Sequence, residues 1–335
     1  MHREQRIPAL DGWRGIAILL VLIAHFYPSE YPIEVQAFLN RLGQHGVTIF
    51  FVLSGFLITS RMVREYEETR RISLSRFYVR RFFRLMPCAW LYLLCMGAMH
   101  ILQPHEALSC ILFFRNFVDF GGHKATQHFW SLSIEEQFYL TWPFVLILAG
   151  RRRALGIAVL GACSAALWRF SIAHSHAITF MQSVATPMRV DALLIGCAAA
   201  LIPARRRLPG QLFLLSAGIV AICCCTFETV APFGESVLQG FLIWSTVNGA
   251  PAAAISLLES RLLTAVGVLS YSLYVWQQFV AQFHSFSVAI ISIEVLVVFA
   301  LAFLSYRYVE KPLRLLGKRL AGAANNGNAC VPRKA

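Results

Sequence analysis

The chain has 335 residues, of which 57% are hydrophobic and 14% charged, and its mean hydropathy is +0.60. A soluble protein of this length cannot bury that much apolar surface, whereas a bundle of membrane helices exposes it to lipid. The net charge of +13 comes mainly from short loops, which indicates membrane topology and argues against nucleic-acid binding. The nine cysteines form no C-x-x-C pair, so the sequence predicts neither a metal site nor a disulfide framework.

Ten apolar segments are long enough to cross a bilayer as helices. They are residues 10–27, 46–62, 82–102, 134–149, 154–173, 187–203, 211–229, 236–255, 262–284 and 288–308. No small-residue cleavage site follows the first segment, so we interpret it as a retained helix and not as a signal peptide. The sequence therefore predicts an all-α fold, a polytopic bundle of ten transmembrane helices.

The basic clusters give this bundle one orientation. Arg3 and Arg6 place the N-terminus in the cytoplasm, and the arginine-rich loop 61–84 lies inside after two crossings. The triple arginine 151–153 is inside only if the short segment 105–118, which contains Arg115, does not span. We therefore predict that 105–118 is re-entrant or interfacial. Residues 205–207 and the basic C-terminal cluster then also lie inside, whereas 121–125 and His174 face outside.

This topology makes residues 1–316 one integral-membrane domain with both termini cytoplasmic. The remaining residues, 317–335, are mostly small and polar, and we expect a disordered cytoplasmic tail.

Two ionisable residues lie within the first apolar segment, Arg14 and His25. Their separation of eleven residues, at roughly 100° and 1.5 Å each, puts them on one helical face about 16 Å apart. Ionisable side chains inside a membrane helix are costly and indicate a functional site. A buried cation and a titratable imidazole suit an enzyme that holds an anionic donor and moves protons.

Arg81 and Arg84 lie three residues apart, on one face at the cytoplasmic end of the third segment. Arginines that snorkel to the membrane surface are the structural alternative, and for Arg80 the two interpretations are evenly balanced. Arg14 lies at the same membrane level as Arg81 and Arg84. Three guanidinium groups at one depth repel each other unless an anion joins them, and they bind phosphate well. We expect these three to bind a phosphorylated cofactor.

Glu135 and Glu136 form an acidic pair that enters the fourth segment, just after His128 and Trp130. A favourable interaction with the helix dipole is the structural alternative. We favour an active-site rim, in which Glu135 would orient or charge the imidazole of His25 if the first and fourth segments are neighbours.

Three further residues are candidates for substrate contact. Arg189 and Asp191 begin the sixth segment on the outer side, where a local ion pair is the alternative. Tyr274 belongs to SYSLYVWQQ, where an interfacial aromatic belt is the alternative. Ser54 and Gly55 favour close helix packing, and Glu310 looks structural.

The segment LDGWRGIAILLVLIAH, which contains Arg14 and His25, closely resembles the first-helix motif of the membrane acyltransferase-3 family. The resemblance continues through FFVLSGFLI, RRFFRLMP, FWSLSIEEQFY, RVDALLIG, SYSLYVWQ and VEKPLR, and covers residues 6–316. It implies an integral-membrane O-acyltransferase that transfers acetyl from acetyl-CoA to hydroxyls of O-antigen, exopolysaccharide, peptidoglycan or similar glycans. Many members have a histidine after the tryptophan of the penultimate helix, where this chain has Gln277.

By this resemblance the functional arginine and histidine match Arg14 and His25, the arginine pair matches Arg81 and Arg84, and the acidic residue matches Glu135. The sequence thus predicts a multi-pass enzyme of a bacterial plasma (inner) membrane. Acetyl-CoA is its co-substrate, a glycan or lipid-linked glycan its acceptor, membrane lipids surround it, and no metal is required. His25 acts as general base or as transient acyl carrier. A transporter of a lipid-linked sugar or acyl group is the alternative function, and a docking protein a distant third.

Overall fold

The computed structural model describes residues 7–28, 30–118, 124–175, 179–203, 210–226, 232–282 and 288–327. All regular elements within these ranges are helical, which confirms the all-α prediction. Several expectations concern residues outside them: the basic residues Arg3, Arg6 and 205–207, the loop at 121–123, and the last residues of the tail from 328 onward.

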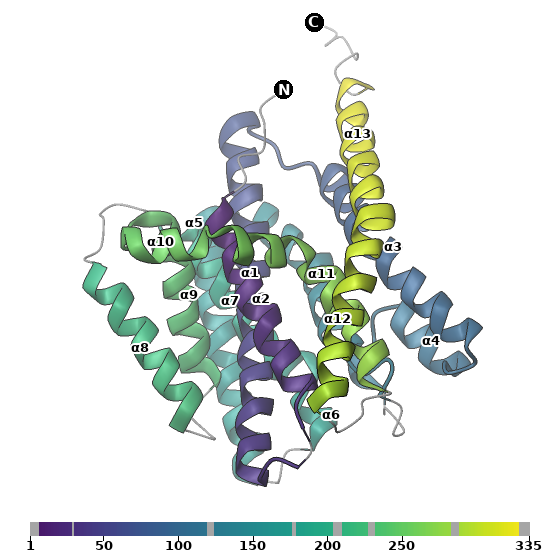
Figure 1. Cartoon of the computed structure of the whole chain (residues 1–335). Helices are drawn as coiled ribbons and strands as arrows, with labels where there is room; N and C mark the ends of the chain where they lie inside the picture. Colours follow the sequence, from purple (N-terminus) through teal and green to yellow (C-terminus); the bar gives the residue numbers. More distant parts are fainter. Residues whose placement is uncertain are drawn as a thin grey trace, which may run out of the picture.

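Thirteen α-helices, α1 to α13, and two short helices, η1 and η2, lie in this part of the chain (Figure 1). They are α1 (Pro8–His25), α2 (Ile33–Thr69), α3 (Leu74–Ala98), α4 (Pro104–Ile111), η1 (Arg115–Phe117), α5 (Phe129–Ser175), α6 (Phe180–Ser183), α7 (Thr186–Leu201), α8 (Gly210–Thr226), α9 (Pro232–Asn248), α10 (Ala252–Leu258), α11 (Arg261–Ala281), α12 (Val288–Ser305), η2 (Tyr306–Glu310) and α13 (Lys311–Gly327).

Each of the ten apolar segments overlaps one of these helices. The segments 134–149 and 154–173 share α5, which Gly150 divides because its φ of 70° and ψ of 167° are not helical. Within the described ranges four helices are long and apolar enough to cross a membrane, or five if α9 and α10, bent by 100°, form one broken span. The crossing by all ten segments therefore stays a prediction.

The segment 105–118 does not form a long helix. Its α4 has eight residues, about 12 Å at 1.5 Å per residue, against roughly 30 Å for a bilayer core. Arg115, which follows in η1, is fully buried. It donates from Nη2 to Glu106 Oε1 (2.9 Å) and from Nε to Thr126 Oγ1 (3.2 Å). These bonds fold the segment back onto the start of α5.

Close backbone contacts hold the centre of the bundle together. A Cβ added to Gly55 of α2 would lie 2.0 Å from the Leu193 carbonyl oxygen of α7, and one added to Gly267 of α11 would lie 1.8 Å from the Asp11 oxygen of α1. Only glycine permits such approaches. The packing role expected for Gly55 is confirmed: α2 packs closely on α7, and α1 on α11.

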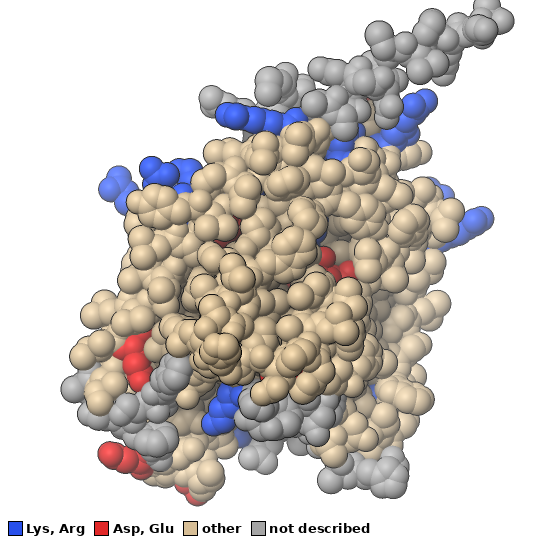
Figure 2. All heavy atoms as spheres, turned by 90° about the vertical axis from the view of Figure 1, so that its right-hand side faces the viewer, with Lys and Arg blue, Asp and Glu red and all other residues tan. Residues whose placement is uncertain are grey.

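The molecular surface separates charge from apolar groups. Figure 2 shows an almost uncharged band across the middle of one face, with Lys and Arg gathered mostly toward one end. Large apolar side chains are exposed on several helices, among them Leu94 of α3 (70%), Leu148 of α5 (82%) and Leu296 of α12 (68%). Such surface is expected where helices face lipid.

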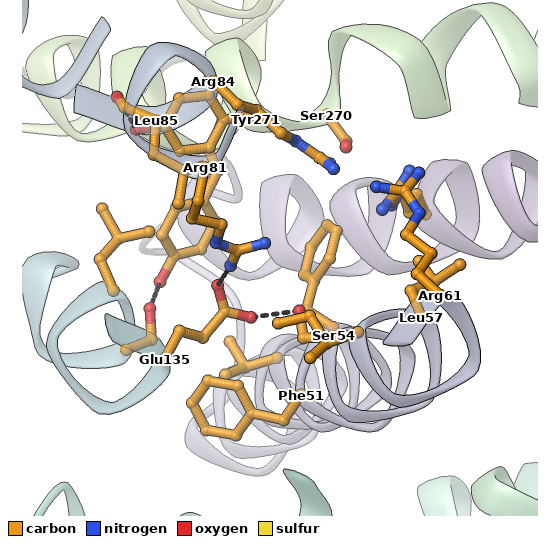
Figure 3. Close-up of a pocket in the computed structure, with 17 residues that line it drawn as sticks. Phe51, Ser54, Leu57, Arg61, Arg81, Arg84, Leu85, Glu135, Ser270 and Tyr271 are labelled. Atoms are coloured by element: carbon orange, nitrogen blue, oxygen red, sulfur yellow. Dashed lines mark hydrogen bonds and ion pairs between the residues drawn. The ribbon is translucent and has the colours of Figure 1, made fainter. Parts of the chain in front are cut away.

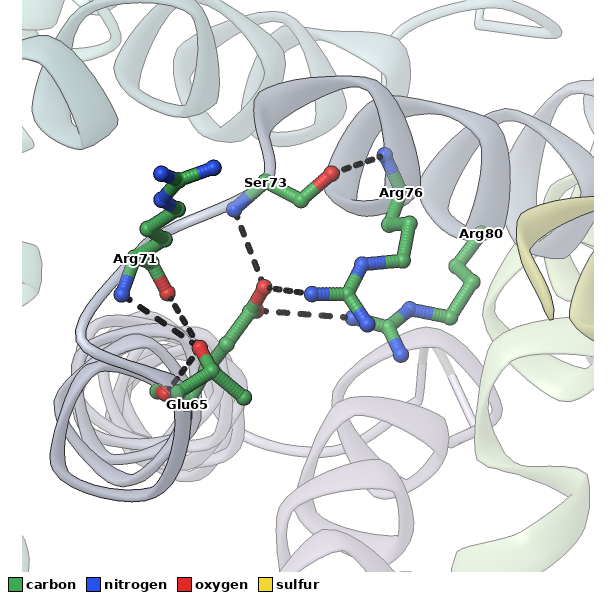
Figure 4. A network of polar contacts seen from close by, with 6 residues as sticks. Glu65, Arg71, Ser73, Arg76 and Arg80 are labelled. Atoms are coloured by element: carbon green, nitrogen blue, oxygen red, sulfur yellow. Dashed lines mark hydrogen bonds and ion pairs between the residues drawn. The ribbon is translucent and has the colours of Figure 1, made fainter. Parts of the chain in front are cut away.

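Glu65 connects the end of α2 to the start of α3 (Figure 4). Its carboxylate accepts hydrogen bonds from the Ser73 backbone N–H (2.9 Å) and from Arg76 Nη2 (2.6 Å), and lies 4.0 Å from Arg80 Nη2. Arg80 therefore points to this turn, and Arg81 and Arg84 are left to face the neighbouring helices.

The structure differs from the expectation of a disordered tail beginning at residue 317. Residues 317–327 continue α13, which packs along α3. A Cβ added to Gly317 would lie 2.5 Å from Phe83 Cβ. The small residue thus lets α13 approach α3 closely, and tertiary packing orders a segment whose composition alone favours disorder.

Candidate active site

A pocket lies between α1, α2, α3, α5 and α11, with about 740 Å³ of space that protein atoms do not fill, including open solvent at its mouth. The lining of the pocket has a polar part and an apolar part. The lining residues are Arg14, Val47, Phe50, Phe51, Ser54, Leu57, Ile58, Arg61, Arg81, Arg84, Leu85, Ser131, Leu132, Glu135, Ser270, Tyr271 and Tyr274. Four arginines and a single glutamate are among them, so the pocket is strongly positive and suits an anion.

The three arginines expected at one level do line one pocket. Arg14 Nη1 lies 3.1 Å from Asp11 Oδ1 on the same helix. Arg84 interacts electrostatically with both Arg14 and Arg81, and its buried Nε has no hydrogen-bond partner among the described residues. A buried guanidinium nitrogen without a hydrogen-bond partner costs free energy, and so does the repulsion between neighbouring arginines. A bound anion would reduce both costs.

Arg81 is engaged by acidic and aromatic groups of α5. Its Nη2 lies 3.8 Å from Glu135 Oε2 and its Nε lies 3.6 Å from Glu136 Oε1. Its guanidinium carbon also stacks 3.3 Å from the centroid of the Tyr139 ring. Figure 3 shows Arg81 directed at Glu135, with Arg61 and Arg84 among the other side chains around the pocket. Arg81 is therefore held by protein groups of α5.

Glu135 lies with the arginines and not with His25. Its Oε1 accepts a hydrogen bond from Ser54 Oγ (2.6 Å), and its other oxygen faces Arg81 (Figure 3). No contact between Glu135 and His25 occurs among the described residues. The sequence argument assumed that the first and fourth apolar segments are neighbours, whereas α1 packs mainly on α2 and α11.

His25 is the last residue of α1, and it does not line the pocket. Its Nδ1 lies 2.8 Å from the Val21 carbonyl oxygen. A carbonyl can only accept, so Nδ1 carries the proton in this contact and Nε2 is the basic nitrogen of the neutral ring. His25 is also close enough to His128 for the two rings to interact electrostatically.

Tyr274 lines the pocket, which agrees with its interpretation as a candidate substrate contact and not with an aromatic belt at the membrane interface. Its hydroxyl lies 2.5 Å from Ser131 Oγ and donates to the His128 carbonyl oxygen at 3.2 Å. Ser131 Oγ donates to the same carbonyl at 3.1 Å. These bonds attach α11 to the start of α5, so the pocket wall and His128 are held as one unit.

Arg189 and Asp191 lie away from the pocket. Asp191 is buried and forms a two-pronged ion pair with Arg169 of α5 (2.7 and 3.3 Å), so a local pair with Arg189 is not what satisfies it. Arg189 instead donates to Gln44 Oε1 and to the Ser183 carbonyl, both at 2.9 Å. Nothing in this geometry distinguishes them as substrate contacts.

Sequence reasoning missed Arg61 and Ser54 as pocket residues. Ser54, Leu57, Ile58 and Arg61 all line the pocket, at the i, i+3, i+4, i+7 spacing of a single helical face. That spacing was the available signal, but Arg61 was assigned to a basic loop because the helix was expected to end near residue 62. The structure extends α2 to Thr69.

Two further polar residues are buried, Glu310 and Gln277. Glu310 accepts a hydrogen bond from Ser272 (2.9 Å) and interacts electrostatically with Arg84 and Arg14. Gln277, fully buried, has no hydrogen-bond partner for either amide atom among the described residues.

Comparisons with known proteins agree with the resemblance. The sequence model of an acyltransferase domain, the acyltransferase-3 type, matches residues 7–306. The Bacillus subtilis strain 168 protein YrhL is 30% identical over 95% of this chain and 57% of its own length.

The peptidoglycan O-acetyltransferase OatA of Listeria monocytogenes is 27% identical over 94% of this chain and 57% of its own length. The O-acetyltransferase OatA of Staphylococcus aureus strain NCTC 8325 is 29% identical over 95% and 58%. The chain thus spans less than two thirds of the length of these relatives, and no solved structure matches it. Since the domain model covers nearly all of the sequence, this protein belongs to the acyltransferase-3 family.

Proposed function

We propose that this protein is an integral-membrane O-acetyltransferase that moves an acetyl group from acetyl-CoA to a hydroxyl of a bacterial cell-wall or surface glycan. The observation that carries the proposal is the pocket lined by Arg14, Arg61, Arg81 and Arg84, in which the buried Nε of Arg84 has no protein partner among the described residues. Family membership and the O-acetyltransferase names of the relatives support the same reaction.

Acetyl-CoA fits the two parts of this pocket. Guanidinium groups bind phosphates through paired hydrogen bonds, so Arg14, Arg61 and Arg84 would hold the phosphates. Arg81 would contribute charge while remaining fixed by Glu135. The apolar wall, with Val47 and Phe50, would accommodate the chain that carries the thioester.

His25 is the proposed centre of the chemistry. It lies eleven residues beyond Arg14 on the continuous helix α1, about 16 Å at 1.5 Å per residue. With Nδ1 bound to Val21, its Nε2 is free to take the proton of an acceptor hydroxyl, or to carry the acetyl group briefly. Both routes remain open, and an acetylated protein trapped without acceptor would identify the second.

The acceptor is a glycan hydroxyl outside the cytoplasm. The three relatives named above all carry O-acetyltransferase names, two of them with peptidoglycan in the name, which favours a cell-wall glycan over O-antigen or exopolysaccharide. A lipid-linked glycan precursor would present the same hydroxyls at the membrane surface.

The decisive experiment incubates the purified protein in detergent with radiolabelled acetyl-CoA and a panel of glycans, with peptidoglycan fragments first. We expect label to appear as alkali-labile O-acetyl ester on one glycan. Movement of a lipid-linked sugar or acyl group across a vesicle membrane without any new ester would support the transporter alternative instead.

We further propose that all ten apolar segments cross a bacterial plasma membrane, with both termini in the cytoplasm. The shortness of α4 supports this, because the basic residues 151–153 then share a side with the arginine-rich turn at Glu65. The pocket arginines would face the cytoplasmic supply of acetyl-CoA.

Cysteine labelling tests this orientation in intact spheroplasts. In a background without native cysteines, Arg152→Cys should react with an impermeant maleimide only after the membrane is opened. His174→Cys, at the other end of the same helix, should react at once. Labelling of Arg152→Cys in closed spheroplasts would mean an odd number of crossings before it, and the proposed orientation would be wrong.

A further inference from the structure

His128 is a buried imidazole that the reaction proposed above leaves without a role. It precedes α5 directly, is 3% exposed, and neither ring nitrogen has a hydrogen-bond partner among the described residues. Leaving a buried polar atom without a hydrogen-bond partner costs free energy. A neutral imidazole has one N–H to donate and one nitrogen to accept. Two such orphaned atoms in one buried ring indicate that a ligand completes them.

The surroundings of His128 keep its ring neutral. The rings of Phe129, Tyr92 and Tyr274 surround it, with centroids 4.9, 5.2 and 5.7 Å away, and none of the described contacts brings a carboxylate to it. Burial among apolar groups disfavours a charged imidazole. The nearby His25 adds repulsion whenever it is protonated. His128 is thus suited to donating a hydrogen bond and not to taking a proton.

His128 is also fixed to the pocket wall. The hydroxyls of Tyr274 and Ser131, both pocket residues, converge on its backbone carbonyl at 3.2 and 3.1 Å. Its backbone is therefore held by residues of the wall that the donor would contact, and its ring interacts electrostatically with the imidazole of His25.

We propose that His128 is a second catalytic residue, whose ring N–H donates a hydrogen bond to the acetyl oxygen as that oxygen becomes negatively charged. This assignment rests on the proposed acetyl transfer. It gives the two imidazoles different roles in that reaction. His25 handles the proton, and His128 stabilises the oxyanion with a preorganised neutral donor.

The step balances with the groups already named. The acceptor oxygen bonds to the acetyl carbon while its proton passes to His25 Nε2, and the carbonyl electron pair moves onto the oxygen held by His128. That pair then returns, the carbon–sulfur bond breaks, and the departing thiolate takes the proton from His25. If His25 first carries the acetyl group, His128 stabilises the oxyanion of each half-reaction.

Replacing His128 by phenylalanine tests this role, because an aromatic ring still packs against Tyr92, Phe129 and Tyr274. In His128→Phe the shape stays and the donor is lost, so we expect kcat to fall by roughly 10²–10³-fold, as for loss of one oxyanion donor. The KM for acetyl-CoA and the calorimetric affinity for coenzyme A should not change. His128→Gln retains an N–H and should recover part of kcat. A base must be unprotonated to act, so kcat of the wild type should rise with pH as His25 loses its proton. The same rise should be seen in His128→Gln, because His25 remains the base.

Three results would overturn the assignment. They are a His128→Phe enzyme with wild-type kcat, equal losses in the Phe and Gln variants, or a kcat of His128→Gln that no longer rises with pH. His128→Ala serves as the donor-free variant if the Phe variant does not fold. A wild-type protein that makes no acetyl ester would overturn the proposed function together with this inference, whereas an active wild type with an unimpaired Phe variant overturns only the inference.

Discussion

His25→Ala is expected to lower glycan acetylation by roughly 10²–10⁴-fold, the range that a lost general base typically causes. His25 ends α1 with its Nδ1 bonded to the carbonyl oxygen of Val21, so the variant loses the basic Nε2 while the helix itself is kept. The measurement is O-acetyl ester released by mild alkali from the glycan of cells that carry the variant.

His105→Ala is the matched control, because His105 is an exposed histidine in the first turn of α4. It should leave the acetyl content unchanged at equal protein level in the membrane. Wild-type acetyl content in His25→Ala cells would remove His25 from the mechanism. Equal affinity of both variants for coenzyme A would show that the loss arises in the chemical step and not in donor binding.

Arg84→Ala is expected to weaken the binding of coenzyme A by about 10–100-fold, since a hydrogen bond to a charged group contributes roughly 1.5–3 kcal/mol. Arg84 lines the pocket with a buried, unpaired Nε, and so has more to gain from a phosphate than Arg81, which already contacts Glu135 and Glu136. Isothermal calorimetry of the purified protein measures the change. Arg84→Lys should restore the affinity only in part, because an ammonium group lacks the planar fork of guanidinium.

Arg80→Ala is the control for charge alone. Arg80 is one turn earlier on the same helix α3, its side chain is 36% exposed, and it faces Glu65 at 4.0 Å. Its removal should leave the affinity for coenzyme A nearly unchanged. S-acetylpantetheine, which lacks the nucleotide phosphates, should be used equally well by Arg84→Ala and wild type. Unchanged calorimetric affinity in both Arg14→Ala and Arg84→Ala would contradict the phosphate site.

Much of the site was accessible from local periodicity. The spacing of Arg81 and Arg84 on α3 placed both guanidinium groups in one pocket, and the intramembrane Arg14 joined them there. Within one helix, rotation and rise per residue are fixed by backbone hydrogen bonding, so the face that a residue occupies follows from its number. The lengths of the apolar runs and the basic residues 151–153 located the helices and the division of α5 near Gly150.

The partners across helices were predicted less well. Glu135 was expected to reach His25 if the first and fourth apolar segments were neighbours, but it contacts Ser54 and Arg81. Asp191 was considered a partner of Arg189, but it pairs with Arg169. In each case the residue lay on the helix that the sequence predicted. Its partner came from another helix, and local sequence patterns do not show which helices pack together.

The sequence by itself determined an all-helical chain with an apolar surface, a basic arginine face, and an arginine and a histidine on the first helix. These features depend on composition and on the 3.6-residue period, which act within one segment. Only the tertiary structure decided that Ser54, Arg61, Glu135 and Tyr274 share a pocket, and that His128 lies near His25. That arrangement depends on which helices approach closely, and the approach is set by contacts such as Gly55 against Leu193 and Gly267 against Asp11, which join residues far apart in the chain.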